Sequence, residues 1–255
     1  MKHAPLDPVG ARVSDIALDA PGDVDALRGL LAEHGVLIFA GQPVDDAAFV
    51  AFLRSFGTLA FTAGETHVEG HSDLNVVSNV GRTTPPKSSF HVDTSYVREP
   101  PAYTALRAVQ IPARGGATQF SNQYRAYETL PGDLRRRLEG RSVTHVVTGL
   151  ELGPDEEASA DHPVFRPHPL TGRVALYLST AKRCAAISGM TPAETEATVA
   201  TLLAHSTRDD NVLRHKWSPG DVVMWDNSAV LHRADHSDVV GDRVMHRGMV
   251  ARYGP

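Results

Sequence analysis

The sequence predicts a mainly β fold with flanking helices, and two patterns along the chain support this. From about residue 74 onward, short apolar segments alternate with turns rich in Pro and Gly, which is typical of sandwiches and barrels. Helical periodicity is confined to residues 1–60 and to one later stretch that begins near Thr191. This order of elements fits a jelly roll of the cupin kind, supported by helices.

Two helices and a strand are predicted within the N-terminal part of the chain. Residues 23–34 carry leucines at helical spacing, and Gly35 is suited to end that helix. Residues 36–40 follow as a continuous apolar run, which predicts a short buried strand. A second helix is expected to begin at Asp45, to place its phenylalanines on the inner face and to end at Gly57.

Most of the remaining chain is expected to form short strands. The candidate strands are residues 74–79, 103–111, 117–121, 142–148, 174–178, 212–217, 221–225 and 243–253. One helix interrupts them, because Thr191 is a suitable N-cap, Pro follows at the first helical position, and Glu194 lies three residues after the cap. Leu202 and Leu203 of this helix would face the core.

Composition limits the class of protein. The chain has 255 residues, which suits one large domain or two small ones. The formal net charge of −5, with no long run of one sign, argues against a dedicated nucleic-acid or membrane-surface role. Cys184 is the only cysteine, so we expect no internal disulfide and a reducing, cytoplasmic setting. The N-terminal residues lack the apolar core of a signal peptide, and no apolar run approaches the ~20 residues of a membrane span.

Two short motifs supply the residue types of a metal site. In Phe90-His91-Val92-Asp93, an imidazole and a carboxylate are two positions apart, so on a strand both would point to one face. The motif from Trp225 to His232 adds a second imidazole, for which His236 and His246 are competing candidates. Two imidazoles and one carboxylate can hold one face of Fe(II) and leave the other open. The hardness of these ligands also permits Zn or Mn.

A carboxylate-binding pair is suggested by Arg243 and Thr118. A turn and a return strand between His232 and Arg243 would bring the guanidinium back beside the metal. Arginine grips a carboxylate through two parallel hydrogen bonds. Thr118, which follows two glycines, could donate a hydroxyl to the same carboxylate. Each residue also has an ordinary alternative, a surface ion pair for Arg243 and a strand position for Thr118.

Taken together, the motifs resemble the taurine dioxygenase / dichlorophenoxyacetate dioxygenase family of Fe(II)- and 2-oxoglutarate-dependent oxygenases. They follow the order of the family and cover residues of roughly 30 to 255. The matching segments are Phe90-His91-Val92-Asp93, Gly115-Gly116-Ala117-Thr118, the block from His162 to Gly172, Trp225-Asp226-Asn227 with His232, and Arg243-Val244-Met245-His246-Arg247.

The resemblance implies a double-stranded β-helix fold and a single domain of residues 1–255. It implies that His91, Asp93 and His232 ligate Fe(II). 2-Oxoglutarate and O₂ would be cosubstrates. The reaction would oxidise an unactivated C–H bond of a small, anionic organic substrate, by hydroxylation or a related oxidation, with release of succinate and CO₂.

The resemblance also assigns roles outside the metal ligands. Thr118 and Arg243 would bind the distal carboxylate of 2-oxoglutarate. The block from His162 to Gly172 would act as scaffold and lid, and its histidines would not ligate the metal. Family members commonly associate, so the resemblance is also compatible with a homo-oligomer.

Substrate contacts are expected from Arg247 and from the segment of residues 62–89. In the family, the arginine at the position of Arg247 commonly meets an anionic group of the substrate. Lys87 and Thr62 replace an asparagine and a sulfonate-binding histidine of the taurine enzyme, which argues against taurine itself. Residues 62–89 are rich in Gly, Thr, His and Pro and are expected to form a mobile loop, in which Asn79 is a further candidate.

Two other classes of protein remain open from the residues alone. A zinc hydrolase could use the same two histidines and aspartate with an activated water, but Arg243 would then have no role. A non-catalytic, cupin-like binding module could hold a structural metal or none.

Overall fold

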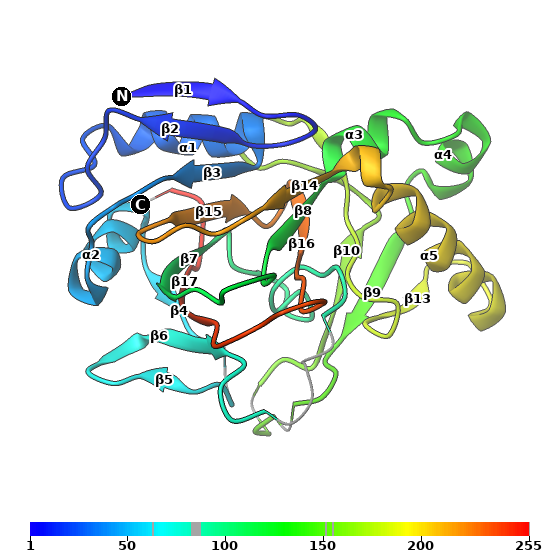
Figure 1. Cartoon of the computed structure of the whole chain (residues 1–255). Coiled ribbons are helices and arrows are strands. Elements are labelled where there is room, and N and C mark those ends of the chain that lie inside the picture. The colour runs from blue at the N-terminus through cyan, green and yellow to red at the C-terminus, as the bar shows by residue number, and fades with distance from the viewer. Residues whose placement is uncertain (63, 83–87, 151, 155, 255) are drawn as a thin grey trace.

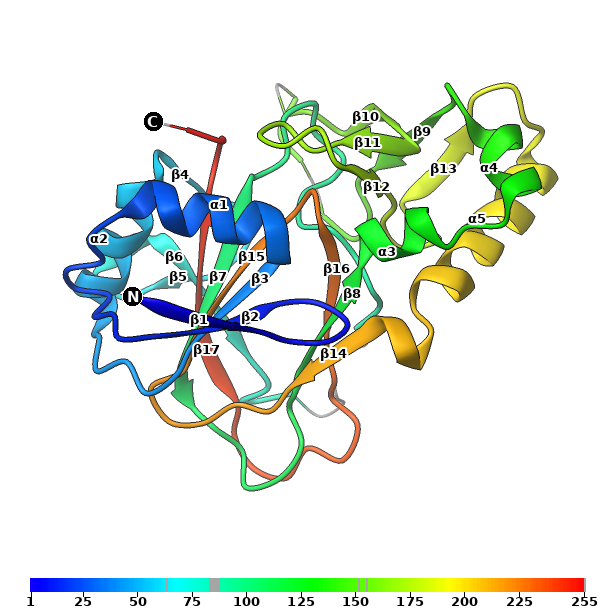
Figure 2. The same cartoon turned by 90° about the horizontal axis from the view of Figure 1, so that it is seen from above.

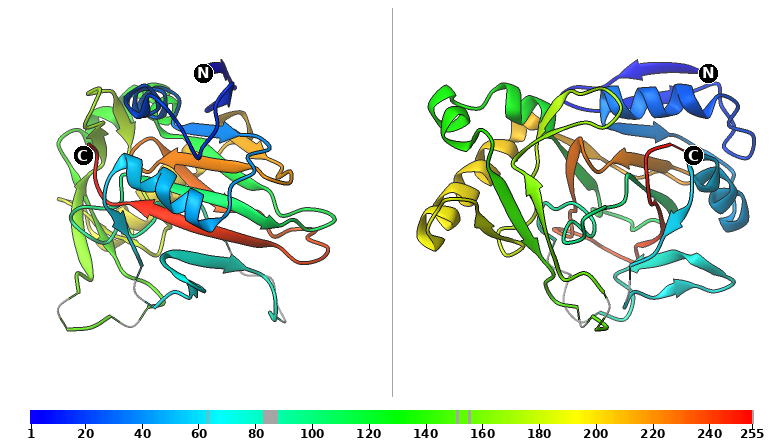
Figure 3. Two further views of the ribbon diagram at one scale, coloured as in Figure 1. Left: turned by 90° about the vertical axis from the view of Figure 1, so that its left-hand side faces the viewer. Right: turned by 180° about the vertical axis from the view of Figure 1, so that it is seen from behind.

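The structure is a computed structural model that describes residues 1–62, 64–82, 88–150, 152–154 and 156–254 (Figure 1). Two layers of strands enclose a central core, and helices flank them, as the views from above and from the side show (Figures 2 and 3). The predicted fold, a mainly β jelly roll of the double-stranded β-helix type with flanking helices, is confirmed.

The larger sheet holds most of the strands that frame the centre of the molecule. Its order is β1-β2-β3-β15-β7-β17-β6-β5, and β4 also pairs with β17. The bounds are β1 (Lys2–Pro5), β2 (Ala11–Ser14), β3 (Val36–Phe39), β4 (Leu59–Ala60), β5 (His67–Val68), β6 (His71–Ser78), β7 (Tyr103–Gln110), β15 (Val222–Asp226) and β17 (Val244–Val250). Because β17 is paired on both sides, residues near the C-terminus lie in the middle of this sheet.

Three smaller sheets complete the β structure. The sheet that faces the larger one consists of β14 (Val212–His215), β8 (Thr118–Asn122) and β16 (Val230–Ala234). The others are β10 (Ser159–Pro163), β9 (Ser142–Val146) and β13 (Cys184–Ile187), and the pair β11 (Phe165–Pro167) and β12 (Val174–Leu176). Every strand predicted from residue 74 onward overlaps an observed strand, but β16, which carries His232, was not predicted.

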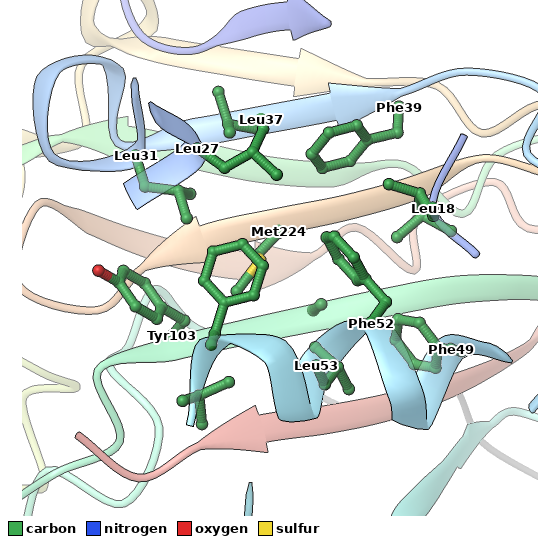
Figure 4. Close-up of a cluster of buried hydrophobic side chains, with 14 of the residues drawn as sticks. Leu18, Leu27, Leu31, Leu37, Phe39, Phe49, Phe52, Leu53, Tyr103 and Met224 are labelled. Atoms are coloured by element: carbon green, nitrogen blue, oxygen red, sulfur yellow. The ribbon is translucent and has the colours of Figure 1, made fainter. Parts of the chain in front are cut away.

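Helices α1 (Val24–His34) and α2 (Asp46–Phe56) cover the outer face of the larger sheet (Figure 2). Asp23 and Asp45 cap them as expected, each accepting a hydrogen bond from a backbone N–H of the first turn. Gly35 ends α1 with a φ of 74°, which favours glycine. The leucines and phenylalanines of both helices pack on strand residues such as Tyr103 and Met224, forming a continuous core (Figure 4).

A second core fills the space between the two facing sheets, and it supports the site described below. Trp225 is fully buried there, with its ring centroid 5.3 Å from that of Phe120 on the opposite sheet. Met245 of β17 and Val223 of β15 pack into the same layer. The inner faces of β8, β16 and β17 therefore meet across tightly packed side chains.

The remaining helices pack at the other end of the molecule, beside β9 and β13 (Figure 2). They are α3 (Gln123–Glu128), α4 (Gly132–Leu138), α5 (Pro192–Ser206) and the 3₁₀ turn η1 (Asp209–Asn211). The predicted start of α5 is confirmed, because Thr191 and Glu194 form a reciprocal capping box. Leu202 is buried in this cluster and Leu203 packs against it.

The segment of residues 62–89 differs from the expected loop. Its centre forms β5 and the eight-residue strand β6, and β6 pairs with β17 of the larger sheet. The expectation of a mobile loop is therefore wrong for His71–Ser78, whereas the strand predicted at residues 74–79 overlaps β6. Separately, within the described part of the chain, no helix is long and apolar enough to cross a membrane.

Candidate active site

His91 and His232 are brought together by backbone hydrogen bonds. The two residues form an isolated β-bridge, in which each backbone N–H donates to the other carbonyl at 3.0 Å. His91–Asp93 is not a regular strand, because Asp93 begins a turn in which Thr94 has a φ of 41°. The turn places the carboxylate of Asp93 beside both imidazoles without a regular strand.

The three predicted ligands converge. The Nε2 atoms of His91 and His232 each lie 3.7 Å from a different oxygen of Asp93. One donor atom from each of the three residues lies within 4.8 Å of the others, and the part of the chain that the structure describes contains no other such group. The Nδ1 of His91 is 2.8 Å from the carbonyl of Ser89, which leaves its Nε2 for a metal.

Buried side chains fix the carboxylate of Asp93. The hydroxyl of Thr104 donates to Asp93 Oδ2 at 2.9 Å, and the amide of Asn227 donates to Thr104 Oγ1 at 2.9 Å. The indole N–H of Trp225 in turn donates to Asn227 Oδ1 at 3.2 Å. Through this chain of hydrogen bonds, the Trp225-Asp226-Asn227 motif determines the orientation of the carboxylate.

Burial and charge set the protonation of these groups. Burial alone would raise the pKa of Asp93, but the nearby Arg247 guanidinium and the two imidazoles lower it well below its usual range. Burial, reinforced by His91, lowers the pKa of His232 to about 3. A charged carboxylate and neutral imidazoles are the forms that bind a metal cation. The residues present therefore fit an Fe(II) ion.

Arg243 lies just before β17 and lines the same cavity as His91 and His232. It is 1% exposed, and it donates to the carbonyl of Gly116 at 2.9 Å and to the hydroxyl of Thr118 at 3.3 Å. Burial lowers its pKa to about 10. No carboxylate of the described residues lies within 4.0 Å of its guanidinium. A buried cation without an anionic partner is costly, so this site favours an anionic ligand.

Gly116 makes this position of Arg243 possible. Its φ is +74°, and a Cβ there would lie 3.0 Å from Cδ of Arg243 and 2.9 Å from Cγ of Pro112. Any other residue would therefore be strained and would also displace the guanidinium. The Gly-Gly-Ala-Thr segment of the sequence thus supplies both the space for Arg243 and the hydroxyl beside it.

Thr118 has one hydrogen-bonding capacity left for a ligand. Its Oγ1 accepts from Nη2 of Arg243 and, at 3.0 Å, from the indole N–H of Trp217. A hydroxyl oxygen has two lone pairs and one proton, so these two donors leave the proton to be given elsewhere. Thr118 lines the cavity, where that proton could meet a carboxylate oxygen.

Two cavities open at the metal ligands. The larger, of ≈ 420 Å³, is lined by both histidines and reaches Thr118 and Arg243. The smaller, of ≈ 180 Å³, is lined by His91 and Asp93 on its other side. Glu65, His91 and Arg247 border both cavities. The three converging residues thus border two cavities, and only the larger one is lined by Thr118 and Arg243.

The residues predicted to contact substrate differ in whether they line one of the two cavities. Arg247 borders both cavities, and Thr62 lines the smaller one. Asn79 borders neither of them; its side chain accepts from the backbone N–H of Arg243 at 2.7 Å and donates to the carbonyl of Gly241. Asn79 therefore positions the start of β17. Lys87 lies outside the described residues.

The other candidate histidines have different partners. His246 lies 2.7 Å from Asp46 on the helix-covered side of the sheet, so it does not face the metal ligands. His168, in the block expected to be scaffold, has its Nε2 2.9 Å from Asp226 Oδ2, and both side chains are fully buried. His236 borders the larger cavity but is not one of the converging ligands.

Comparison with known proteins shows the family to which the chain belongs. The chain matches the family described as "Taurine catabolism dioxygenase TauD, TfdA family" over residues 2–249. It belongs to this family. The alpha-ketoglutarate-dependent 2,4-dichlorophenoxyacetate dioxygenase of Cupriavidus pinatubonensis is 32% identical over 276 aligned residues, covering 95% of each protein.

Solved structures agree with this assignment. A taurine dioxygenase from Burkholderia xenovorans superposes with a TM-score of 0.85 at 32% identity, over 98% of this chain and 90% of that one. A second protein, solved with Mn(II) and N-oxalylglycine, also gives 0.85, at 26% identity, over 100% and 99% of the two chains.

Membership of the TauD/TfdA family settles the class of reaction. The protein is an Fe(II)- and 2-oxoglutarate-dependent dioxygenase, which uses O₂ to oxidise a C–H bond of a small organic substrate. The zinc hydrolase and the non-catalytic binding module are not favoured, because the relatives are alpha-ketoglutarate-dependent oxygenases.

Three residues that contact the site were not found from the sequence. Thr104 lies in β7 and Trp217 lies just after β14, and only the fold shows that they donate hydrogen bonds to Asp93 and Thr118. Arg183 borders the smaller cavity from the turn before β13. A single arginine in a polar turn gives no sequence pattern that separates it from a solvated surface residue.

Trp217→Phe tests the contact to Thr118. We expect it to raise the 2-oxoglutarate concentration needed for half-maximal succinate formation roughly fivefold, because one neutral hydrogen bond contributes about 1 kcal/mol. Affinity for N-oxalylglycine in the Mn(II)-loaded protein should fall equally. A rise in the requirement for 2-oxoglutarate without weaker N-oxalylglycine binding would contradict this role.

Proposed function

We propose that His91, Asp93 and His232 hold the Fe(II) and that Thr118 and Arg243 bind the distal carboxylate of 2-oxoglutarate. The observation that carries this proposal is that His91 and His232, which converge with Asp93, line the same cavity as the buried guanidinium of Arg243, which has no carboxylate partner among the described residues. A diacid that neutralises Arg243 at one end has its other end directed to the histidines.

The residues of the chain have separate tasks in this mechanism. Bound iron would supply redox chemistry with O₂ and an open coordination face for the keto-acid end of 2-oxoglutarate. Thr104, supported by Asn227, donates to Oδ2 of Asp93 and keeps the carboxylate oriented. The other oxygen, Oδ1, accepts from Arg247. The buried indole of Trp225 forms the apolar wall of the larger cavity and excludes water from it.

We also propose that the prime substrate is a small organic anion. The relatives named above act on a carboxylate, 2,4-dichlorophenoxyacetate, and on a sulfonate, taurine. In this chain, Arg183 and Arg247 both border the smaller cavity beside the metal ligands, which suits a negatively charged group. We further propose that residues 1–255 act as one catalytic domain. A cytoplasmic location and a homo-oligomeric state are predicted from the sequence and its family resemblance.

Metal analysis combined with an oxygen electrode tests the proposal. The purified protein should take up one Fe(II) per chain, and with 2-oxoglutarate it should consume O₂ and form succinate in equal amounts. A panel of small carboxylates and sulfonates should raise this rate, and neutral alcohols of the same shape should not. Zinc binding with hydrolysis that needs neither O₂ nor 2-oxoglutarate would contradict the assignment.

A further inference from the structure

The inner face of β16 continues beyond the metal position. Side chains alternate along an extended chain, so His232, Ala234 and His236 point to one side. All three line the larger cavity. The middle one has only a methyl group, which leaves room for a ligand to extend from one imidazole toward the other.

The pairing of β16 with β8 (Figure 1) brings His236 to the end of the cavity that holds Arg243. Ala234 is the register partner of Thr118, and one residue further along each chain a backbone hydrogen bond of 2.7 Å continues the ladder. Continuing this register places His236 opposite Gly116, whose carbonyl accepts from Nε of Arg243. The imidazole and the guanidinium therefore lie at the same level of the two strands.

The segment that carries His236 is fixed by its neighbour Asp235. One oxygen of this carboxylate accepts from the side-chain amide of Gln119 at 3.1 Å, and the other accepts from the backbone N–H of Ser237 at 3.0 Å. The chain is thus fastened on both sides of His236. A side chain on a fixed backbone loses less entropy when it binds a ligand.

The imidazole of His236 has a ring nitrogen to offer. Its Nδ1 is buried and makes no hydrogen bond within the part of the chain that the structure describes. Burial lowers the pKa of His236, Arg243 and Arg82 lower it further, and Asp235 acts in the opposite direction. The ring is therefore neutral at neutral pH, and a neutral imidazole has one N–H to donate.

We propose that His236 is a third residue that binds the distal carboxylate of 2-oxoglutarate, beside Thr118 and Arg243. This inference rests on the proposed function, since it assumes that the diacid extends from the metal position to Arg243. A carboxylate has about four acceptor positions, so Thr118 and Arg243 leave some for another donor. The Nδ1 of His236 donates its N–H to one of them and so gains the partner that the protein does not supply.

This role couples cosubstrate binding to a proton. A carboxylate beside His236 favours the charged imidazole, so the pKa of His236 is higher in the complex than in the free protein. Between these two pKa values the complex holds more protons than the free protein. The affinity for 2-oxoglutarate therefore rises as the pH falls through this range.

Calorimetry on the Mn(II)-loaded protein tests the proposal without turnover. Two keto acids are titrated at about pH 6 and about pH 8. They are 2-oxoglutarate and 2-oxopentanoate, which has the same chain and chelating end but no distal carboxylate. We expect the wild type to bind 2-oxoglutarate more tightly at the lower pH. His236→Ala should weaken 2-oxoglutarate roughly tenfold, since hydrogen bonds to charged groups contribute most, and should leave 2-oxopentanoate unchanged.

His236→Gln separates the hydrogen bond from the proton. Glutamine keeps an N–H donor but does not titrate, so this variant should weaken 2-oxoglutarate less than His236→Ala does. Its affinity for 2-oxoglutarate should no longer depend on pH. A merely structural role of the imidazole would not produce this difference between the two variants.

His3→Gln is the matched control. His3 is an exposed residue of β1 and lines neither cavity. This variant should bind both keto acids as the wild type does, with the same pH dependence. Thermal unfolding of each variant checks that the fold is retained.

The outcomes separate this inference from the proposed function. If the wild type binds 2-oxoglutarate and His236→Ala binds it as tightly, or weakens both keto acids equally, His236 does not bind the distal carboxylate. A pH dependence that persists in His236→Gln also contradicts the inference. If 2-oxoglutarate does not bind the Mn(II)-loaded wild type at all, the proposed function fails, and the inference fails with it.

Discussion

Asp93→Ala is expected to abolish succinate formation and to lower affinity for Fe(II) by more than roughly 100-fold. Even the partners that only orient a metal ligand contribute about 10–100-fold to metal affinity, and Asp93 is proposed as a ligand itself. Its carboxylate is the only one among the converging donors. Two imidazoles without it carry no negative charge to balance a divalent cation.

The fold should survive this change. Asp93 lies in a turn after an isolated bridge, and Glu65 still pairs with Arg247 in its absence. Equilibrium dialysis with Fe(II) and with Mn(II) measures metal affinity. Circular dichroism checks that the fold is retained, and succinate formation measures activity. Asp73→Ala, which removes a carboxylate paired with Arg54 at the surface, is the control and should retain metal and activity. A folded Asp93→Ala protein with full activity would refute the metal assignment.

Much of this centre could be predicted because its signals are local. His91 and Asp93 are two positions apart, and the segment from Trp225 to His232 lies next to a strongly apolar strand. The spacing does not require a strand, because a single bridge to His232 followed by a tight turn also brings His91 and Asp93 together. The spacing therefore indicated which residues converge, but not the backbone that brings them together.

The long-range part of the site could not be predicted in this way. β16 was missed because it follows β15 after a short turn but lies in the facing sheet, where its partner is β8, a long-range pairing that no local pattern indicates. Glu65 and Arg183 are ordinary charged residues in polar segments, and their pairing state depends on what the folded chain places beside them. Whether such a charged side chain can bind a ligand depends on whether it already has an ion-pair partner, and only the tertiary structure shows this.

Arg247 shows the same limit for a residue that was predicted. The four-residue spacing predicts that Arg243, just before β17, and Arg247, within it, lie on one side, and both line the larger cavity. The sequence could not show that Asp93 and Glu65 already occupy Arg247, nor that Arg243 lacks any carboxylate among the described residues. Arg247 therefore has two carboxylates beside it, whereas Arg243, just before β17, has none among the described residues.

Arg243→Met is expected to have the second large effect, on the binding of 2-oxoglutarate. We expect the 2-oxoglutarate requirement to rise by a factor that corresponds to roughly 2–5 kcal/mol, because a buried charged partner of a carboxylate is lost. Methionine fills a similar volume beside Gly116 without a charge. Arg243→Lys keeps the charge but loses the planar fork, so its requirement should lie between those of the wild type and the methionine variant.

Stability distinguishes a ligand-binding arginine from a structural one. In the absence of 2-oxoglutarate, Arg243 is a buried cation, and replacing it with an apolar side chain should leave the free energy of unfolding unchanged or raise it. In the wild type, saturating 2-oxoglutarate with Mn(II) should raise the melting temperature, since a ligand that binds only the folded state stabilises it. That rise should disappear in Arg243→Met. If the variant is strongly destabilised and yet keeps the wild-type requirement for 2-oxoglutarate, Arg243 serves the fold and the diacid binds elsewhere.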